Sequence, residues 1–171
     1  MFLHFFLVLI IVLAFLLYPY FYSSDRTNNK VESQDIYTKI EELRKLVNVI
    51  VNHIQLSRAF TNLNDDSLKS RQRPFLLPSY EIYPSDTITR TEDQRIIRLV
   101  LWDKHSHKLY DDNTLIYATL HEIAHIMAPE EAEHGDPEFE EIEDLLLKTA
   151  MKLGYYNPHL SLPENYSCMI E

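Results

Sequence analysis

The residues best suited to chemistry are concentrated in one stretch, LHEIAHIMAPEEAEHGDPEF, which runs from Leu120 to Phe139. His121 and His125 are four positions apart, so on a helix their imidazoles project from one face and can bind one ion. Glu122 stands beside them, where its carboxylate can take a proton from metal-activated water. Burying three such side chains without partners would cost several kcal/mol, and a bound ion would offset that cost. The pattern therefore predicts a metal site, with zinc as the cofactor and Glu122 as the catalytic base.

The third ligand of such a site has to come from elsewhere in the chain. His134 lies beyond an interval that contains Pro129, which lets the chain turn back toward the end of the helix. A third imidazole is a common choice for a zinc held by two others. A carboxylate from the following segment is the alternative, and both Glu143 and Glu140 have suitable distances along the chain. We favour His134. The predicted metal ligands are therefore His121, His125 and His134.

Two helices are predicted around these residues. Asp111–Asn113 offers an N-cap ahead of TLIYATLHEIAHIMA, an almost wholly apolar segment that Pro129 ends. A helix that is apolar on all sides has to be buried. After an acidic loop, Asp136 and Pro137 are typical of the start of a second helix, and Gly154 is typical of its end. The candidate ligands would thus lie on a buried helix and on the loop that follows it.

The segments ahead of these helices predict a small sheet. Tyr80–Tyr83 and Arg95–Trp102 are rich in β-branched and aromatic residues and are bounded by turn formers, as strands are. The part of the second strand from Ile96 to Trp102 could pair with an extended peptide substrate. The preceding segment, Ser57–Ser79, is polar and irregular and is predicted to be a loop.

An amphipathic helix is predicted over residues 34–57. Its apolar residues recur every three or four positions, at Ile36, Ile40, Leu43, Val47, Ile50 and Ile54. The pattern lasts for less than three heptads, so a coiled coil is the less favoured interpretation. We expect the helix to pack on the domain that follows.

The N-terminal segment Phe2–Tyr22, FLHFFLVLIIVLAFLLYPYFY, is as long and apolar as a helix that crosses a bilayer. A cleaved signal peptide is the alternative, but its apolar part would usually be shorter and would end in small residues rather than tyrosines. We therefore expect a transmembrane anchor over residues 1–22, followed by a polar linker over residues 23–33.

Charge and cysteine content bear on the location and partners of the rest of the chain. Basic residues follow the predicted anchor and none precedes it, which predicts a cytosolic C-terminal domain. The single cysteine, Cys168, agrees, although the glycosylation pattern at Asn165 points the other way. The net charge is −10, and the 46 residues after His125 contain 11 acidic residues but two basic ones. Nucleic-acid binding through that part is not expected.

The stretch from about Arg95 to Pro158 resembles the WLM/SprT-like minimal zinc metallopeptidases, and most closely their small, often membrane-anchored members in large eukaryotic DNA viruses. The pieces that carry the resemblance are DDNTLIYATLHEIAH and the later H-G…P-E-F. The resemblance implies that His121, His125 and His134 bind zinc and that Glu122 is the general base. Relatives that cleave DNA–protein crosslinks are basic and unanchored, so that substrate is not expected here.

Together these features predict an α+β chain with an N-terminal transmembrane helix, an amphipathic helix, a small β-sheet, a zincin-type active-site helix and a second helix. The zincin-like domain would occupy residues 58–171. The expected function is a membrane-anchored zinc peptidase that acts on protein or peptide substrates, in a virion or host membrane. The alternative is a virion membrane or capsid-associated structural protein with a structural zinc, and other virion or capsid proteins are candidate partners.

Overall fold

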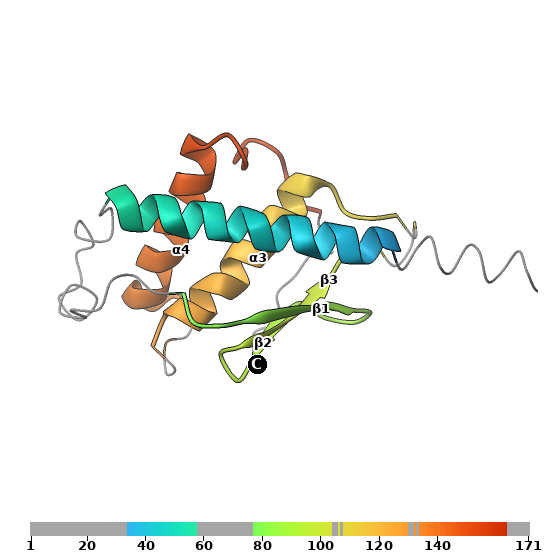
Figure 1. The fold of residues 1–171 in the computed structure, drawn as a ribbon, viewed down its shortest axis with the longest axis horizontal. Helices are drawn as coiled ribbons and strands as arrows, with labels where there is room; N and C mark the ends of the chain where they lie inside the picture. The colour runs from blue at the N-terminus through green and yellow to red at the C-terminus, as the bar shows by residue number, and fades with distance from the viewer. Residues whose placement is uncertain are drawn as a thin grey trace, which may run out of the picture. The chain divides into compact units, whose positions relative to one another are not determined.

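The computed structural model describes residues 34–57, 77–103, 106, 108–129, 132 and 134–163. The chain divides into two compact units, Met1–Lys39 and Ile40–Glu171. Within the first unit the described residues, 34–39, are helical. The helix continues to residue 57 in the second unit, where the other described elements follow in the order β1, β2, β3, α3 and α4 (Figure 1). Their bounds are Glu81–Ser85 for β1, Arg90–Glu92 for β2, Ile96–Val100 for β3, Asp112–Met127 for α3 and Pro137–Lys152 for α4.

The three strands form one sheet in the order β1-β3-β2. β1 is parallel to β3, with Ile82 opposite Ile97, and β2 is antiparallel to β3, with Thr91 opposite Ile97. Both predicted strands are therefore present, although their ends differ. β3 lies between β1 and β2, so the suggestion that its segment pairs with a substrate peptide is wrong. Of the two neighbours of β3, β2 lies beside α3.

β2 was not predicted from the sequence, and its turn explains why. Asp93 and Gln94 connect β2 to β3 with positive φ angles of 50° and 51°, and the Arg95 N–H donates to the Glu92 carbonyl at 3.1 Å. Two central residues of positive φ make a type I′ turn, which is usually signalled by Asn-Gly or Asp-Gly. Neither dipeptide is present here, and a strand of three residues is too short to show an alternating pattern.

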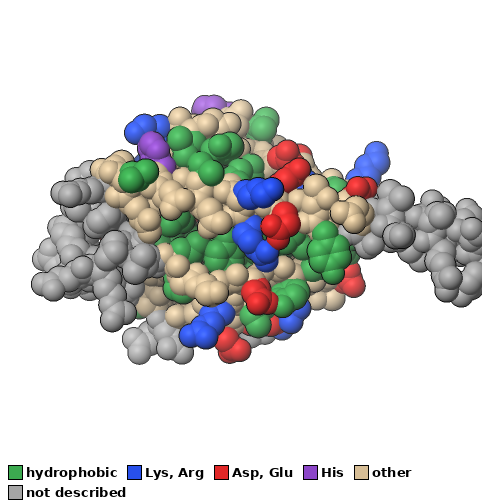
Figure 2. Space-filling view, in the orientation of Figure 1, with side chains coloured by type: hydrophobic (Ala, Val, Ile, Leu, Met, Phe, Trp, Pro, Cys, Tyr) green, Lys and Arg blue, Asp and Glu red, His purple; other side chains and the backbone are tan. Residues whose placement is uncertain are grey.

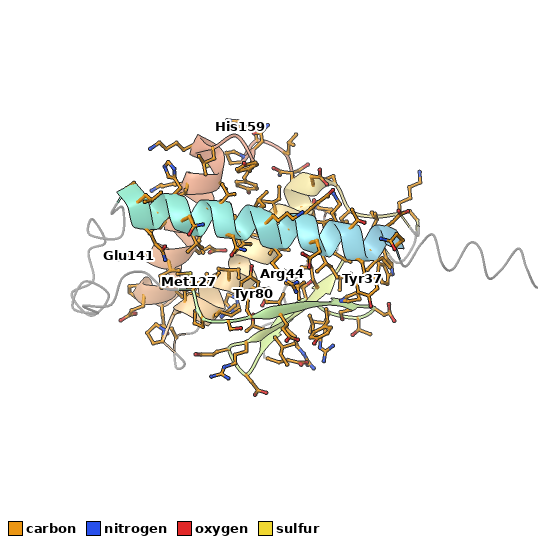
Figure 3. All side chains as sticks on the ribbon, in the orientation of Figure 1. Tyr37, Arg44, Tyr80, Met127, Glu141 and His159 are labelled. Atoms are coloured by element: carbon orange, nitrogen blue, oxygen red, sulfur yellow. The ribbon has the colours of Figure 1, made fainter. Side chains whose placement is uncertain are left out.

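The helix over residues 34–57 buries the apolar stripe predicted for it. Within the second unit, Val47, Ile50 and Ile54 are completely buried and Leu43 is nearly so. The apolar residues are buried without a second chain, as expected if the helix packs on the domain that follows and not in a coiled coil. Tyr80, just before β1, lies near Arg44 of this helix (Figure 3). Burial raises the pKa of Tyr80 to about 12, against the opposing effect of the Arg44 charge.

α3 is the buried centre of the unit and begins and ends as predicted. The Asp111 carboxylate accepts from the Thr114 N–H at 3.0 Å and caps the helix, and the chain leaves the helix at Ala128, just before Pro129. The residues of α3 are buried on nearly all sides, and the helix packs against α4, β2 and β3 (Figure 1).

α4 packs on α3 through Phe139, Ile142 and Leu146. Its Pro137 is the first helical residue, as predicted, but the Asp136 side chain makes no capping hydrogen bond. At the other end Gly154 has a φ of 78°, and the N–H groups of Gly154 and Tyr155 donate to the carbonyls of Met151 and Ala150. This pair of bonds is a Schellman motif, so the predicted glycine C-cap is confirmed.

Several basic residues of the described surface pair with acids. Figure 2 shows Lys and Arg side chains beside Asp and Glu on the face that it presents. Arg44 lies 2.5 Å from Glu41, and Glu92 accepts from both Arg90 and Arg98. These hydrogen bonds lower the pKa of Glu92, and the one from Arg90 has the largest effect. The absence of a nucleic-acid partner stays a prediction.

The predicted architecture needs one correction. No helix among the described residues is both long enough and apolar enough to cross a membrane. The predicted anchor over residues 1–22 and the linker over residues 23–33 lie outside those residues. The structure is therefore α+β, with three described helices and a small sheet, and a transmembrane helix and a single-pass membrane localisation are not supported.

Candidate metal centre

Three histidines come together at one end of the α3–α4 pair. His121 and His125 lie one turn apart on α3, and His134 lies in the turn before α4. The Nε2 atom of His134 is 2.8 Å from Nε2 of His121 and 3.0 Å from Nε2 of His125. Gly135 follows with a φ of 90°, a conformation that suits glycine and lets the chain turn from His134 into α4. The structure thus brings together the three residues predicted as metal ligands.

The donor atoms of this cluster fit a metal ion. One ligand atom from each histidine lies within 4.8 Å of the others. Two nitrogens of a tetrahedral zinc site with bonds of about 2.0 to 2.1 Å are about 3.3 Å apart, so the closest pairs here need to separate by only a few tenths of an ångström. Among the described residues this is the one group of three or more His, Cys, Asp or Glu side chains that could hold an ion. The ligand set therefore fits a metal, although it does not identify which one.

The protonation state of His125 suits the same role. Burial lowers its pKa to about 4, and the neighbouring His121 and His134 act in the same direction against the opposing charge of Glu143. The imidazole is therefore neutral at physiological pH. Metal binding requires neutral histidines, so no proton has to be displaced from His125 when an ion binds near neutral pH.

Glu143 is placed differently from the role considered for it in the sequence. Its Oε1 lies 2.7 Å from Nδ1 of His121, on the opposite side of the ring from the nitrogen that faces His134. Glu140, the other carboxylate considered as a ligand, lies on the exposed face of α4. The geometry therefore favours His134 as the third ligand over Glu143 and Glu140, because its Nε2 atom lies close to Nε2 of both other histidines.

Glu122 is completely buried and bonded to the sheet. The Thr91 hydroxyl on β2 donates to its Oε2 at 2.7 Å. The partnership spans 31 positions in sequence, and no local pattern indicates it. Thr91 is therefore a residue of the candidate site that sequence reasoning missed.

Aromatic side chains surround the histidines. The centroid of the Phe139 ring lies 5.3, 4.4 and 5.1 Å from those of His121, His125 and His134. On α3, Tyr117 stacks on His121 at 6.1 Å, and Tyr156 stacks on Tyr117 in turn. An apolar surround limits the access of water and strengthens electrostatic interactions in the site. The sequence analysis gave Phe139 no role at the metal centre.

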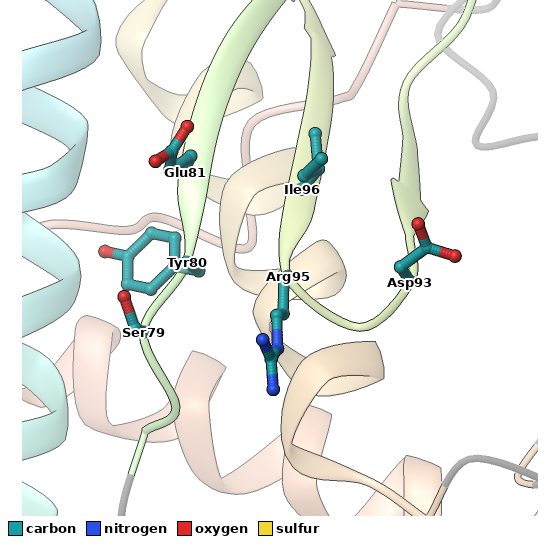
Figure 4. A pocket seen from close by; sticks show the side chains of 6 residues that line it. All are labelled: Ser79, Tyr80, Glu81, Asp93, Arg95 and Ile96. Carbon is teal, nitrogen blue, oxygen red and sulfur yellow. The ribbon is translucent and has the colours of Figure 1, made fainter.

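A separate pocket of about 590 Å³ lies where β1 begins and β2 turns into β3 (Figure 4). It is lined by Ser79, Tyr80, Glu81, Asp93, Arg95 and Ile96. None of the three histidines contributes to it, so this pocket is distinct from the candidate metal centre.

Comparison with known proteins gives a limited result. No family model and no solved structure matches the chain. Part of the chain is similar to a viral protein. Over 81 residues, which is 47% of this chain, it is 37% identical to the uncharacterized protein 042R of Invertebrate iridescent virus 3. The matched region spans half the length of that relative, so the two agree in part of their sequences, and the match assigns no activity.

Proposed function

We propose that the chain is a zinc-dependent peptidase whose metal ligands are His121, His125 and His134. The observation that carries the proposal is the convergence of the three Nε2 atoms, two from a buried helix and one from the following turn. Three imidazoles are a ligand set typical of catalytic zinc, which keeps a fourth position for water or substrate.

In this proposal the protein contributes proton transfer and orientation. Bound zinc would polarise the carbonyl of the scissile peptide bond and lower the pKa of the attacking water. Glu122 takes the proton from that water and passes it to the leaving amine. The Thr91 hydroxyl restrains the Glu122 carboxylate by donating to Oε2, and it does so from β2. An extended protein or peptide segment would bind alongside β2, at the edge of the sheet, instead of β3.

The resemblance to WLM/SprT-like metallopeptidases supports the same proposal. Its two motif pieces contain the proposed metal ligands and the proposed base. HEIAH contains His121, Glu122 and His125, and H-G…P-E-F contains His134 and Phe139. The similar protein is viral, which supports a viral origin. Virion or capsid proteins are the proposed substrates.

A structural zinc in a capsid-associated protein is the second candidate. A structural site is normally closed by a fourth protein ligand. Among the described residues the cluster contains three candidate ligands, and the Glu143 carboxylate lies on the Nδ1 side of His121. The set of three ligands among the described residues favours the enzyme, whereas the packing of Phe139 against all three rings is the feature that favours a structural role.

The test compares wild type with Glu122→Gln at equal zinc content. Both full-length chains are incubated alone, with a denatured protein and with a peptide library, and the products are identified by mass spectrometry. We expect wild type to cleave and the variant to be slower by about 10²-fold or more, because the general base is missing. Glu140→Gln, which makes the same change at an exposed position, is the control and should cleave normally. If zinc-loaded wild type makes no product that Glu122→Gln lacks, the peptidase proposal is wrong.

A further inference from the structure

We propose that Glu143 is the positioning residue of the metal centre, and that it sets metal affinity without touching the ion. The proposal rests on metal binding by the three histidines, but it does not depend on peptidase activity. It assigns to this carboxylate of α4 a role different from the direct ligation considered for it in the sequence.

The hydrogen bond between Glu143 and His121 fixes the protonation pattern of the ring. Oε1 of Glu143 is an acceptor 2.7 Å from Nδ1, so Nδ1 carries the hydrogen and donates it. The lone pair of the neutral ring is then on Nε2, the atom that faces His134 at 2.8 Å. A carboxylate on the second nitrogen of a metal-binding histidine fixes its tautomer and orientation and raises its basicity.

The surroundings make this hydrogen bond stronger than one on the surface. The side chains of His121 and Glu143 are only 9% and 19% exposed. Tyr117 and His134 stack on the His121 ring, and Phe139 meets it edge to face. In such a place water competes little with the charged carboxylate for the Nδ1 hydrogen. The hydrogen bond therefore holds the ring against rotation.

A second observation locates the Glu143 charge in the same region. Burial is the main cause that raises the pKa of Tyr156, and the negative charge of Glu143 is the second. Tyr156 stacks on Tyr117, which stacks on His121. The Glu143 carboxylate of α4 thus contacts α3 through His121, and its charge acts on Tyr156 in the segment after α4.

The same geometry argues against Glu143 as a direct ligand. Its oxygen lies beside Nδ1, whereas the nitrogens that would bind the ion converge on the Nε2 side. To reach the ion, the carboxylate would have to leave the Nδ1 hydrogen and pass around the ring. Glu143 therefore acts through His121.

The experiment measures zinc affinity of the full-length chain by competition with a chromophoric chelator at pH 7.5. The variants are Glu143→Gln, Glu143→Ala, the exposed control Glu140→Gln, and His134→Ala. We expect Glu143→Ala to bind one zinc about 10- to 100-fold more weakly than wild type, which is the usual effect of removing such a partner. Glu143→Gln keeps an oxygen that can accept from Nδ1 and should lose less, and Glu140→Gln should bind as wild type does.

A second measurement reads the tautomer directly. In the metal-free chain, long-range ¹⁵N–¹H NMR should show the hydrogen of His121 on Nδ1 in wild type and in Glu143→Gln. In Glu143→Ala a mixture of tautomers should appear. This comparison is made between chains whose circular dichroism shows that they are folded, and it requires neither zinc nor a substrate.

The outcomes separate this proposal from the proposed function. Equal affinity of wild type and both Glu143 variants would overturn the positioning role. So would a loss of zinc affinity in Glu143→Ala as large as that in His134→Ala, because Glu143 would then be a ligand. A wild type that binds no zinc but shows the expected tautomers would refute the zinc proposal and its affinity consequence, while leaving the hydrogen bond intact.

Discussion

The bond between Thr91 and Glu122 is the best point at which to test the arrangement around the candidate base. Thr91→Val keeps the shape of the side chain but removes the hydroxyl that donates to Oε2 at 2.7 Å. Glu122 is completely buried, so water does not readily replace the lost donor. A hydrogen bond to a charged group contributes about 1.5 to 3 kcal/mol, and leaving a buried acceptor without it costs a similar amount. We expect the free energy of unfolding to fall by about 1.5 to 3 kcal/mol.

The assay is urea denaturation of the full-length chain with a chelator present, so that metal binding does not contribute to stability. Thr91→Ser is the control, because it keeps the hydroxyl and loses a methyl group. A loss of about 2 kcal/mol would also lower the melting temperature by about 4 to 8 °C for a chain of this size. If valine and serine at this position are equally stable, within about 0.5 kcal/mol, the hydroxyl does not hold the Glu122 carboxylate and this account of the site is refuted.

Two further predictions concern pH and the end of α4. Burial lowers the pKa of His125 from its usual 6.5 to about 4. Between these pH values the unfolded chain binds a proton at His125 that the folded chain does not. The stability of the metal-free protein should therefore fall as the pH decreases from about 6.5 to 4. Thermal melts at several pH values should show a shallower slope for His125→Asn, and an unchanged slope would contradict the assigned cause. Gly154→Ala should cost about 1 to 2 kcal/mol in urea denaturation, because alanine is strained at a φ of 78°, and a neutral effect would show that the Schellman end of α4 relaxes without cost.

The parts of the fold that were predictable are those specified by neighbouring residues. Asp111 and Pro129 set the ends of α3, and apolar residues at every third or fourth position identified the helix over residues 34–57. His121 and His125 belong to one helical turn, so their proximity follows from α-helix geometry. His134 could be predicted because the loop that joins it to α3 is short and contains a proline.

What could not be predicted depends on contacts between distant residues. Thr91 reaches Glu122 across 31 positions, and Glu143 reaches His121 across 22. The spacing along the chain indicated Glu143 and Glu140 as possible metal ligands, but it did not show that Glu143 meets Nδ1 of His121 instead of the ion. The place of β3 between two other strands likewise depends on β2, whose turn lacks the usual glycine.

The burial of Glu122 and its hydrogen bond to Thr91 bear on the question of whether the protein is an enzyme or a structural protein. A buried carboxylate without a partner would itself be evidence for function, because burial is costly. Here Thr91 supplies a partner, so the burial of Glu122 is compatible with either role. Glutamine at this position keeps an oxygen that can accept from the Thr91 hydroxyl but cannot act as a base. Glu122→Gln therefore changes proton transfer more than packing, and a difference in cleavage at equal zinc content would reflect catalysis.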